Sequence, residues 1–147
     1  MQPIPVAIRR LTQPDRPLVA QSWAHGLRSV TPWGDVEGNV RRANAYVDRA
    51  LHRSSAWVLA NKADEARILG WACASIGGGP PVLHWIWVRE DWRRLGLARR
   101  LLAHVLTEAS IKFVLSGWSR MGAELVRGCA EMFQPWPECY RPDLGRC

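Results

Sequence analysis

The stretch His84–Leu106, HWIWVREDWRRLGLARRLLAHVL, changes character twice along its length. It begins as an apolar run typical of a buried strand and passes through a group of arginines around a single glycine, Gly96. Apolar residues then recur at helical spacing at Ala98, Leu101, Leu102, Val105, Leu106 and Ala109. The stretch therefore predicts a strand that enters an amphipathic helix through an arginine-glycine turn.

Such a turn is physically suited to bind a diphosphate. The first turn of a helix has unpaired N–H groups and a partial positive charge, which together favour an anion. Gly96 and Ala98 leave room for a ligand to approach the backbone, and Arg93, Arg94 and Arg99 add positive charge. Neither GxxxxGK[ST] nor a GxGxxG after a strand is present. A plain strand-loop-helix joint with surface arginines stays open as the alternative.

The rest of the chain predicts an α/β layer structure in the order β-α-α-β-β-β-α-β-α. Strands are expected at 6–11, 56–61, 67–76, 82–88 and 112–116, and further helices from about 16 to 27, from 39 and at 120–133. Strict alternation in the strand 82–88 would place Val82, His84, Ile86 and Val88 on one face. Leu83, Trp85 and Trp87 would then lie on the other face.

Composition indicates one globular domain over residues 1–147, since 48% of residues are hydrophobic and 22% are charged. No apolar run approaches the ~20 residues of a membrane span, and no secretory signal is visible. A cytoplasmic protein is therefore expected. The four cysteines and four histidines are not at metal-ligand spacing, so no metal site is expected.

The net charge of +7 favours a polyanionic partner, either nucleic acid or a phosphorylated cofactor. Nearly all of the positive charge is arginine, however, and a compositional bias toward arginine explains it equally well. The nine tryptophans are expected mainly in the core, with a base-stacking surface as the less favoured alternative.

The segment VREDWRRLGLARRLL resembles the acyl-CoA-binding motif of the GNAT (GCN5-related) N-acetyltransferase superfamily. Val88, Arg93, Gly96 and Ala98 occupy the motif positions, and Trp92 takes an aromatic position before the arginine. The element order is also similar to that fold over nearly the whole chain. A weaker similarity connects residues 70–102 to GNAT-like proteins of phages and prophages.

The resemblance implies a mixed, mostly antiparallel sheet with helices on both faces, and acetyl-CoA as the acyl donor. It implies that the pantetheine arm lies along the strand ending at Val88, near Ile86 and Trp87. The diphosphate would be held by residues of the turn and the helix start, which are Arg93, Arg94, Leu95, Gly96, Leu97, Ala98 and Arg99. Direct transfer of acetyl to an amine acceptor is the implied reaction.

Amine acetylation benefits from a base for the ammonium and an acid for the departing thiolate. His84 is the candidate base, and a histidine hydrogen-bonded between layers is the competing interpretation. Tyr140 and Ser119 are candidate acids, because the last predicted helix lacks the tyrosine common in the family. Tyr46 is a further possibility.

Three functions follow from these observations. The first is an N-acetyltransferase acting on a small-molecule or protein amine. The second is a phage-type enzyme that modifies a nucleobase or a base-linked amine in DNA, with phosphate contacts from Arg41, Arg42, Arg49 and Arg53. The third is a CoA- or DNA-binding domain without catalysis. A homodimer is compatible with all three.

Overall fold

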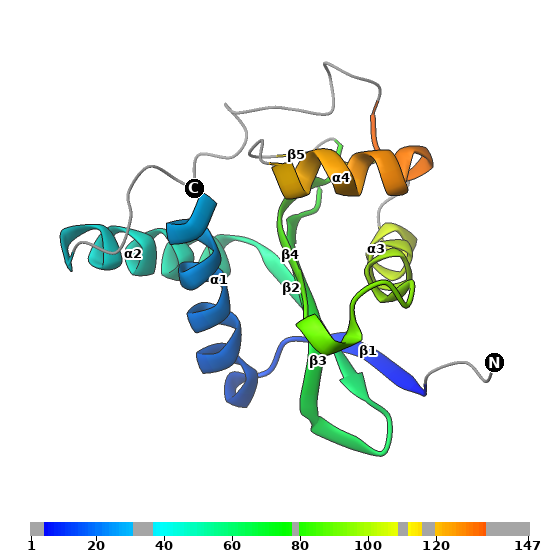
Figure 1. Ribbon diagram of the computed structural model, residues 1–147, viewed down its shortest axis with the longest axis horizontal. Helices are drawn as coiled ribbons and strands as arrows, with labels where there is room; N and C mark the ends of the chain where they lie inside the picture. The colour runs from blue at the N-terminus through cyan, green and yellow to red at the C-terminus, as the bar shows by residue number, and fades with distance from the viewer. Residues whose placement is uncertain (1–4, 31–36, 78–79, 109–111, 116–119, 135–147) are drawn as a thin grey trace.

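The computed structural model of the chain describes residues 5–30, 37–77, 80–108, 112–115 and 120–134. A five-stranded sheet in the order β1-β2-β3-β4-β5 lies at the centre, with α1 and α2 on one face and α3 and α4 on the other (Figure 1). Strands β1 to β4 pair antiparallel, and β4 pairs parallel with β5. The predicted α/β class and element order are confirmed over the described residues.

The strands are β1 Val6–Arg10, β2 Ser55–Asn61, β3 Asp64–Ser75, β4 Val82–Val88 and β5 Val114–Leu115. The α-helices are α1 Arg16–Val30, α2 Glu37–Arg53, α3 Leu97–Thr107 and α4 Arg120–Gly128. Short 3-10 turns occupy Gln13–Asp15, Glu90–Trp92 and Ala130–Met132. No helix in this described part of the chain is long and apolar enough to cross a membrane.

Each face of the sheet has its own apolar core. Under α1 and α2 the buried residues include Val19 and Trp23 of α1, Val47 of α2 and Trp71 of β3. Under α3 the core contains residues of the helix and of the facing strands, namely Leu97, Leu101, Leu102, Val105, Leu59, Leu69 and Leu83. A sheet covered on both faces accounts for the almost continuously apolar sequences of β2, β3 and β4.

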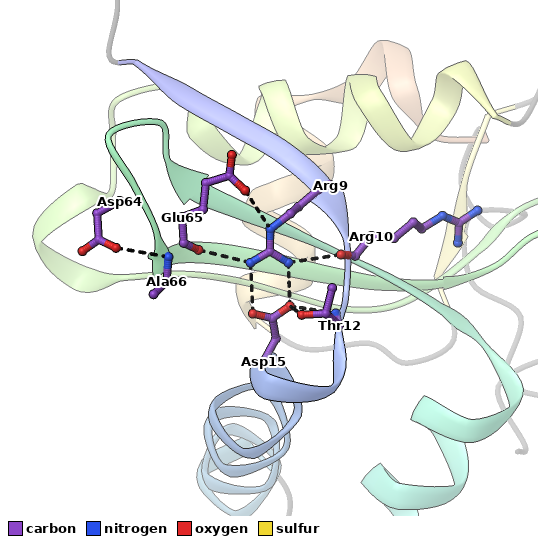
Figure 2. Close-up of polar contacts among 7 residues, drawn as sticks. All are labelled: Arg9, Arg10, Thr12, Asp15, Asp64, Glu65 and Ala66. Carbon is purple, nitrogen blue, oxygen red and sulfur yellow. Dashed lines mark hydrogen bonds and ion pairs between the residues drawn. The ribbon is translucent and has the colours of Figure 1, made fainter.

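A partly buried ion pair fixes the start of α1 against the sheet (Figure 2). The Arg9 guanidinium donates to both carboxylate oxygens of Asp15, at 2.6 and 3.1 Å, and to the Glu65 carbonyl at 3.1 Å. The Thr12 N–H and hydroxyl each donate to Asp15 at 2.7 Å, which forms a capping box. The hydrogen bonds from Arg9 and Thr12 lower the pKa of Asp15 to about 2. The network joins β1, the beginning of α1 and the β2–β3 hairpin.

The predicted alternation in β4 is confirmed from Trp85 to Val88 but is wrong for Leu83, because the strand contains a β-bulge. Cys73 pairs with Trp85 and Ala74 pairs with Leu83, so His84 has no partner on β3. After the bulge the side-chain pattern is inverted relative to Leu83. Leu83 therefore packs in the α3 core, whereas Trp85 packs against the α1–α2 core.

The last strand and the last helix are shorter over the described residues than the sequence predicts. Among the described residues of the predicted strand at 112–116, Val114–Leu115 form the strand and Phe113 instead forms a parallel bridge with Phe133; residue 116 lies outside the described residues. Their rings pack 5.8 Å apart in the α3 core. Because α4 ends at Gly128, the chain returns toward β5 and Phe133 is buried there.

Candidate functional site

The carboxyl-terminal half of β4 has an unpaired edge in the described part of the chain. β5 pairs only with Val82 and Leu83, while β3 follows β4 on its other side as far as Val88. Unpaired main-chain N–H and C=O groups on such an edge can bond an extended ligand that carries amides. Ile86, Trp87 and Val88, the predicted pantetheine contacts, lie along this half and are partly buried.

The turn after β4 holds its glycine in a left-handed conformation. Arg93 Nε donates to the Val88 carbonyl at 2.8 Å and so holds the turn against the end of the strand. Arg94 and Gly96 both have positive φ, at 62° and 75°. A Cβ on Gly96 would meet nothing within 4 Å, so the space in front of this residue is open. Glycine is favoured here by backbone conformation and leaves the approach to α3 clear.

Backbone donors and positive charge converge at this opening. The Arg100 N–H donates to the Gly96 carbonyl at 3.1 Å, which closes the first turn of α3 and leaves the preceding N–H groups without intrahelical partners. Arg93, Arg94, Leu95 and Gly96 are all exposed. Exposed backbone donors, a helix amino terminus and arginine side chains are the chemistry that binds a diphosphate, so these residues fit a CoA-type ligand.

Two residues of the predicted diphosphate site also make contacts that stabilise the fold. Leu97 is only 2% exposed and packs in the α3 core, so its backbone alone faces the turn. The Arg99 guanidinium forms an ion pair with Glu131 and donates to the Gly128 carbonyl at 2.7 Å. Arg99 thus connects α3 to the end of α4, and Ala98 beside it is partly buried. Arg93 and Arg94 are the arginines that border the open turn itself.

His84 lies in the bulge of β4 and is 7% exposed. Its Nε2 is 2.7 Å from the Ser75 hydroxyl oxygen, and its Nδ1 has no hydrogen-bond partner among the described residues. Burial lowers the pKa of His84 from 6.5 to about 4. The imidazole is therefore neutral at pH 7, with Nε2 beside Ser75 and Nδ1 buried without a partner among the described residues.

The two predicted acids, Ser119 and Tyr140, lie outside the described residues. Tyr46 on α2 is partly buried and makes an edge contact with Trp23 at 6.1 Å between ring centroids. Sequence reasoning missed Ser75 and Glu131, whose importance depends on contacts between distant elements. No cluster of histidine, cysteine, aspartate or glutamate within the described ranges is suited to hold a metal ion.

A mixed sheet, a β4 edge that is unpaired among the described residues and a turn that leads into α3 together fit an acyl-CoA-binding α/β protein. The chain belongs to the GNAT family of acetyltransferases, because the model of that family matches residues 20–112. Membership of this family makes the protein an acetyltransferase with acetyl-CoA as donor. Comparison with curated protein sequences gave no match.

Solved structures show the same fold at low sequence identity. A predicted acetyltransferase from Clostridium acetobutylicum, crystallised with acetyl-CoA, is 16% identical with a TM-score of 0.63, over 90% of this chain and 92% of that one. Ribosomal-protein-alanine N-acetyltransferase from Brucella melitensis is 16% identical with a TM-score of 0.62, over 88% and 92%. PaiA N-acetyltransferase from Thermoplasma acidophilum, in complex with coenzyme A, is 9% identical with a TM-score of 0.59, over 84% and 87%.

Proposed function

We propose that the protein transfers acetyl directly from acetyl-CoA to the amine of a small molecule or a protein. The observation that carries this proposal is the continuous path from the unpaired β4 edge, through the open turn at Gly96, to the amino terminus of α3. When bound, acetyl-CoA supplies the acetyl group as a thioester. A cytoplasmic location and a homodimer belong to the same proposal.

Positioning is the first contribution of the chain. The backbone of Ile86, Trp87 and Val88 would pair with the amides of the pantetheine arm along the edge of β4. The N–H groups at the start of α3 would hold the diphosphate, with Arg93 and Arg94 at its border. Orientation of two reactants in this way removes translational and rotational entropy from the barrier, which is a large part of catalysis in direct transfer.

Proton handling is the second contribution. A free ammonium has a pKa near ~10 and must lose a proton before it attacks. His84 is the proposed acceptor, supported by its place in the bulge next to the unpaired edge and by its neutral state at pH 7. Ser119 and Tyr140 remain proposed donors to the departing thiolate.

An amine attached to nucleic acid is the second candidate acceptor. Arg41, Arg42, Arg49 and Arg53 are all exposed on α2, the helix that packs with α1 over one face of the sheet. Phosphate contacts by such residues give binding that weakens steeply with salt. Steady duplex binding from low to physiological salt, or no binding at low salt, would remove the support for this candidate.

The direct test is turnover with acetyl-CoA against a panel of polyamines, amino acids, peptides with free amino termini and amine-bearing oligonucleotides. We expect CoA release that depends on one of these acceptor classes, with an acetylated product seen by mass spectrometry. Saturable binding of acetyl-CoA with no acetylated product from any class would contradict the catalytic proposal and favour a binding domain.

A further inference from the structure

Three polar side chains from distant parts of the sequence form a continuous hydrogen-bonded series. The Ser54 hydroxyl oxygen, just after α2, lies 3.2 Å from that of Ser75 at the end of β3. The Ser75 hydroxyl oxygen lies 2.7 Å from His84 Nε2 in the bulge of β4. The Ser54 N–H donates to the Ala50 carbonyl at 2.9 Å, which fixes this end of the series to the last turn of α2. We refer to Ser54, Ser75 and His84 as the serine-histidine series.

The β-bulge is what brings His84 to Ser75. Cys73 belongs to the core under α1 and α2, and Ser75 follows it by two residues along β3, so both lie on that face. His84 is the extra residue opposite the Cys73–Ala74 step. In a bulge, two consecutive residues lie opposite one residue of the partner strand, and this changes the direction in which the side chain of the extra residue points. The series therefore depends on a local irregularity at this position.

Within the serine-histidine series the imidazole is more buried than the two serine side chains. His84 is 7% exposed, while Ser75 and Ser54 are both partly exposed. Where the end of β3 meets the end of α2, the titratable or charged groups are the buried Cys73 and the exposed His52 and Arg53. The pKa of His84 is lowered by burial and not by a nearby charge. An imidazolium at this position has no described carboxylate to stabilise it.

We propose that Ser75 and Ser54 are positioning residues that hold His84 with its proton on Nε2 and pass that proton toward solvent when Nδ1 accepts one. The inference rests on the proposed function of His84 as the proton acceptor. In the resting state Nε2–H donates to the Ser75 oxygen, and the Ser75 hydroxyl donates to the Ser54 oxygen. Nδ1 is buried and has no partner among the described residues, so it is the ring nitrogen left to accept the proton of the acceptor amine.

The proton count balances at each step. The amine N–H bond breaks as the Nδ1–H bond forms, and Nε2–H breaks as Ser75 takes its proton. Ser75 gives its own proton to Ser54, and Ser54 gives its proton to water. One proton leaves the amine and one reaches solvent, so a buried imidazolium need not persist. This arrangement lets a histidine with a weakly basic ring serve as a relay.

The tautomer of His84 tests the geometry without any turnover. We expect nitrogen-15 NMR of the wild-type protein at pH 7 to show neutral His84 with its proton on Nε2. Ser75→Ala should give a mixture of both tautomers, and Ser75→Thr should restore the wild-type pattern. A proton on Nδ1 in the wild type, or a pattern unaffected by Ser75→Ala, would overturn the proposal.

Kinetics then test the role of the series. With a productive acceptor, Ser75→Ala should lower kcat by about 100-fold, leave the KM for acetyl-CoA unchanged and alter the pH profile of kcat. Ser75→Thr should retain most of kcat, and Ser54→Ala should cause a smaller loss. Ser55→Ala is the matched control, since this neighbouring serine is not a member of the series, and it should behave as wild type.

The outcomes separate this inference from the proposed function. If His84→Gln abolishes turnover but Ser75→Ala retains the wild-type kcat and pH profile, the relay is wrong and the base is supported. If His84→Gln retains full turnover, the base itself is wrong and the relay falls with it. Should Ser75→Ala fold poorly, the wild-type tautomer and the Ser75→Thr kinetics still decide the question.

Discussion

Lowering the pH from 7 to 4.5 is expected to destabilise the protein through His84. Its pKa is about 4 in the folded chain, compared with an ordinary value of 6.5. The unfolded chain therefore binds the proton more tightly, so the stability contribution is complete above pH 6.5 and is lost as the pH falls toward 4. At 1.36 kcal/mol per pH unit, this difference corresponds to about 3 kcal/mol in full, most of which is lost by pH 4.5.

The assay is urea unfolding of the wild type and His84→Gln at several pH values between 7 and 4.5. Glutamine keeps a polar group beside Ser75 but does not titrate. The difference in free energy of unfolding between the two proteins removes contributions that they share. Asp15 interferes little, because its pKa is 3.8 ordinarily and about 2 in the folded chain, so its stability contribution is lost mainly below pH 4.5. We expect the free energy of unfolding of the wild type to fall by about 2–3 kcal/mol relative to that of His84→Gln across the range. Parallel stability curves would refute the burial of a neutral His84.

Two further predictions concern the packing of α1 against the sheet. Gly26→Ala should destabilise the protein by about 1–2 kcal/mol despite the better helix propensity of alanine, because its Cβ would lie 2.6 Å from the Trp85 ring. Gly38→Ala on α2 is its control and should not destabilise, since nothing lies within 4 Å of the new Cβ; equal unfolding midpoints for the two variants would contradict this account. Asp15→Asn should cost about 2–3 kcal/mol at pH 7 in urea unfolding, because Arg9 then keeps only the exposed Glu65 carboxylate at 3.6 Å; a loss under about 0.5 kcal/mol would show that the Arg9–Asp15 pair adds little.

The elements with strong local patterns were predictable from the sequence. The apolar stripe of α3 and the apolar run of β4 each contain more apolar residues than a surface loop would. Their order along the chain predicted the turn between them. The position of Gly96 at the start of the helix was predictable for the same reason, because a left-handed residue at a helix boundary favours glycine.

Features that depend on contacts between distant elements were not predictable. The bulge at His84 arises from the pairing of β4 with β3 and leaves no mark on the alternation of β4 alone. The pairing of Arg99 with Glu131 requires the end of α4 to lie against α3, so the motif alone did not predict this contact. The position of Ser75 beside His84 follows from the same strand register.

The acyl-CoA site at the β4–α3 turn is the central claim, and calorimetric titration of acetyl-CoA tests it most directly. Gly96→Glu should weaken binding by about 100-fold, because a carboxylate roughly 6 Å from the diphosphate costs about 3 kcal/mol at an effective dielectric constant near 20. Gly38→Glu adds the same charge on exposed α2 and should bind like the wild type. Equal affinities for the two variants, or no binding by the wild type, would contradict the placement of the site.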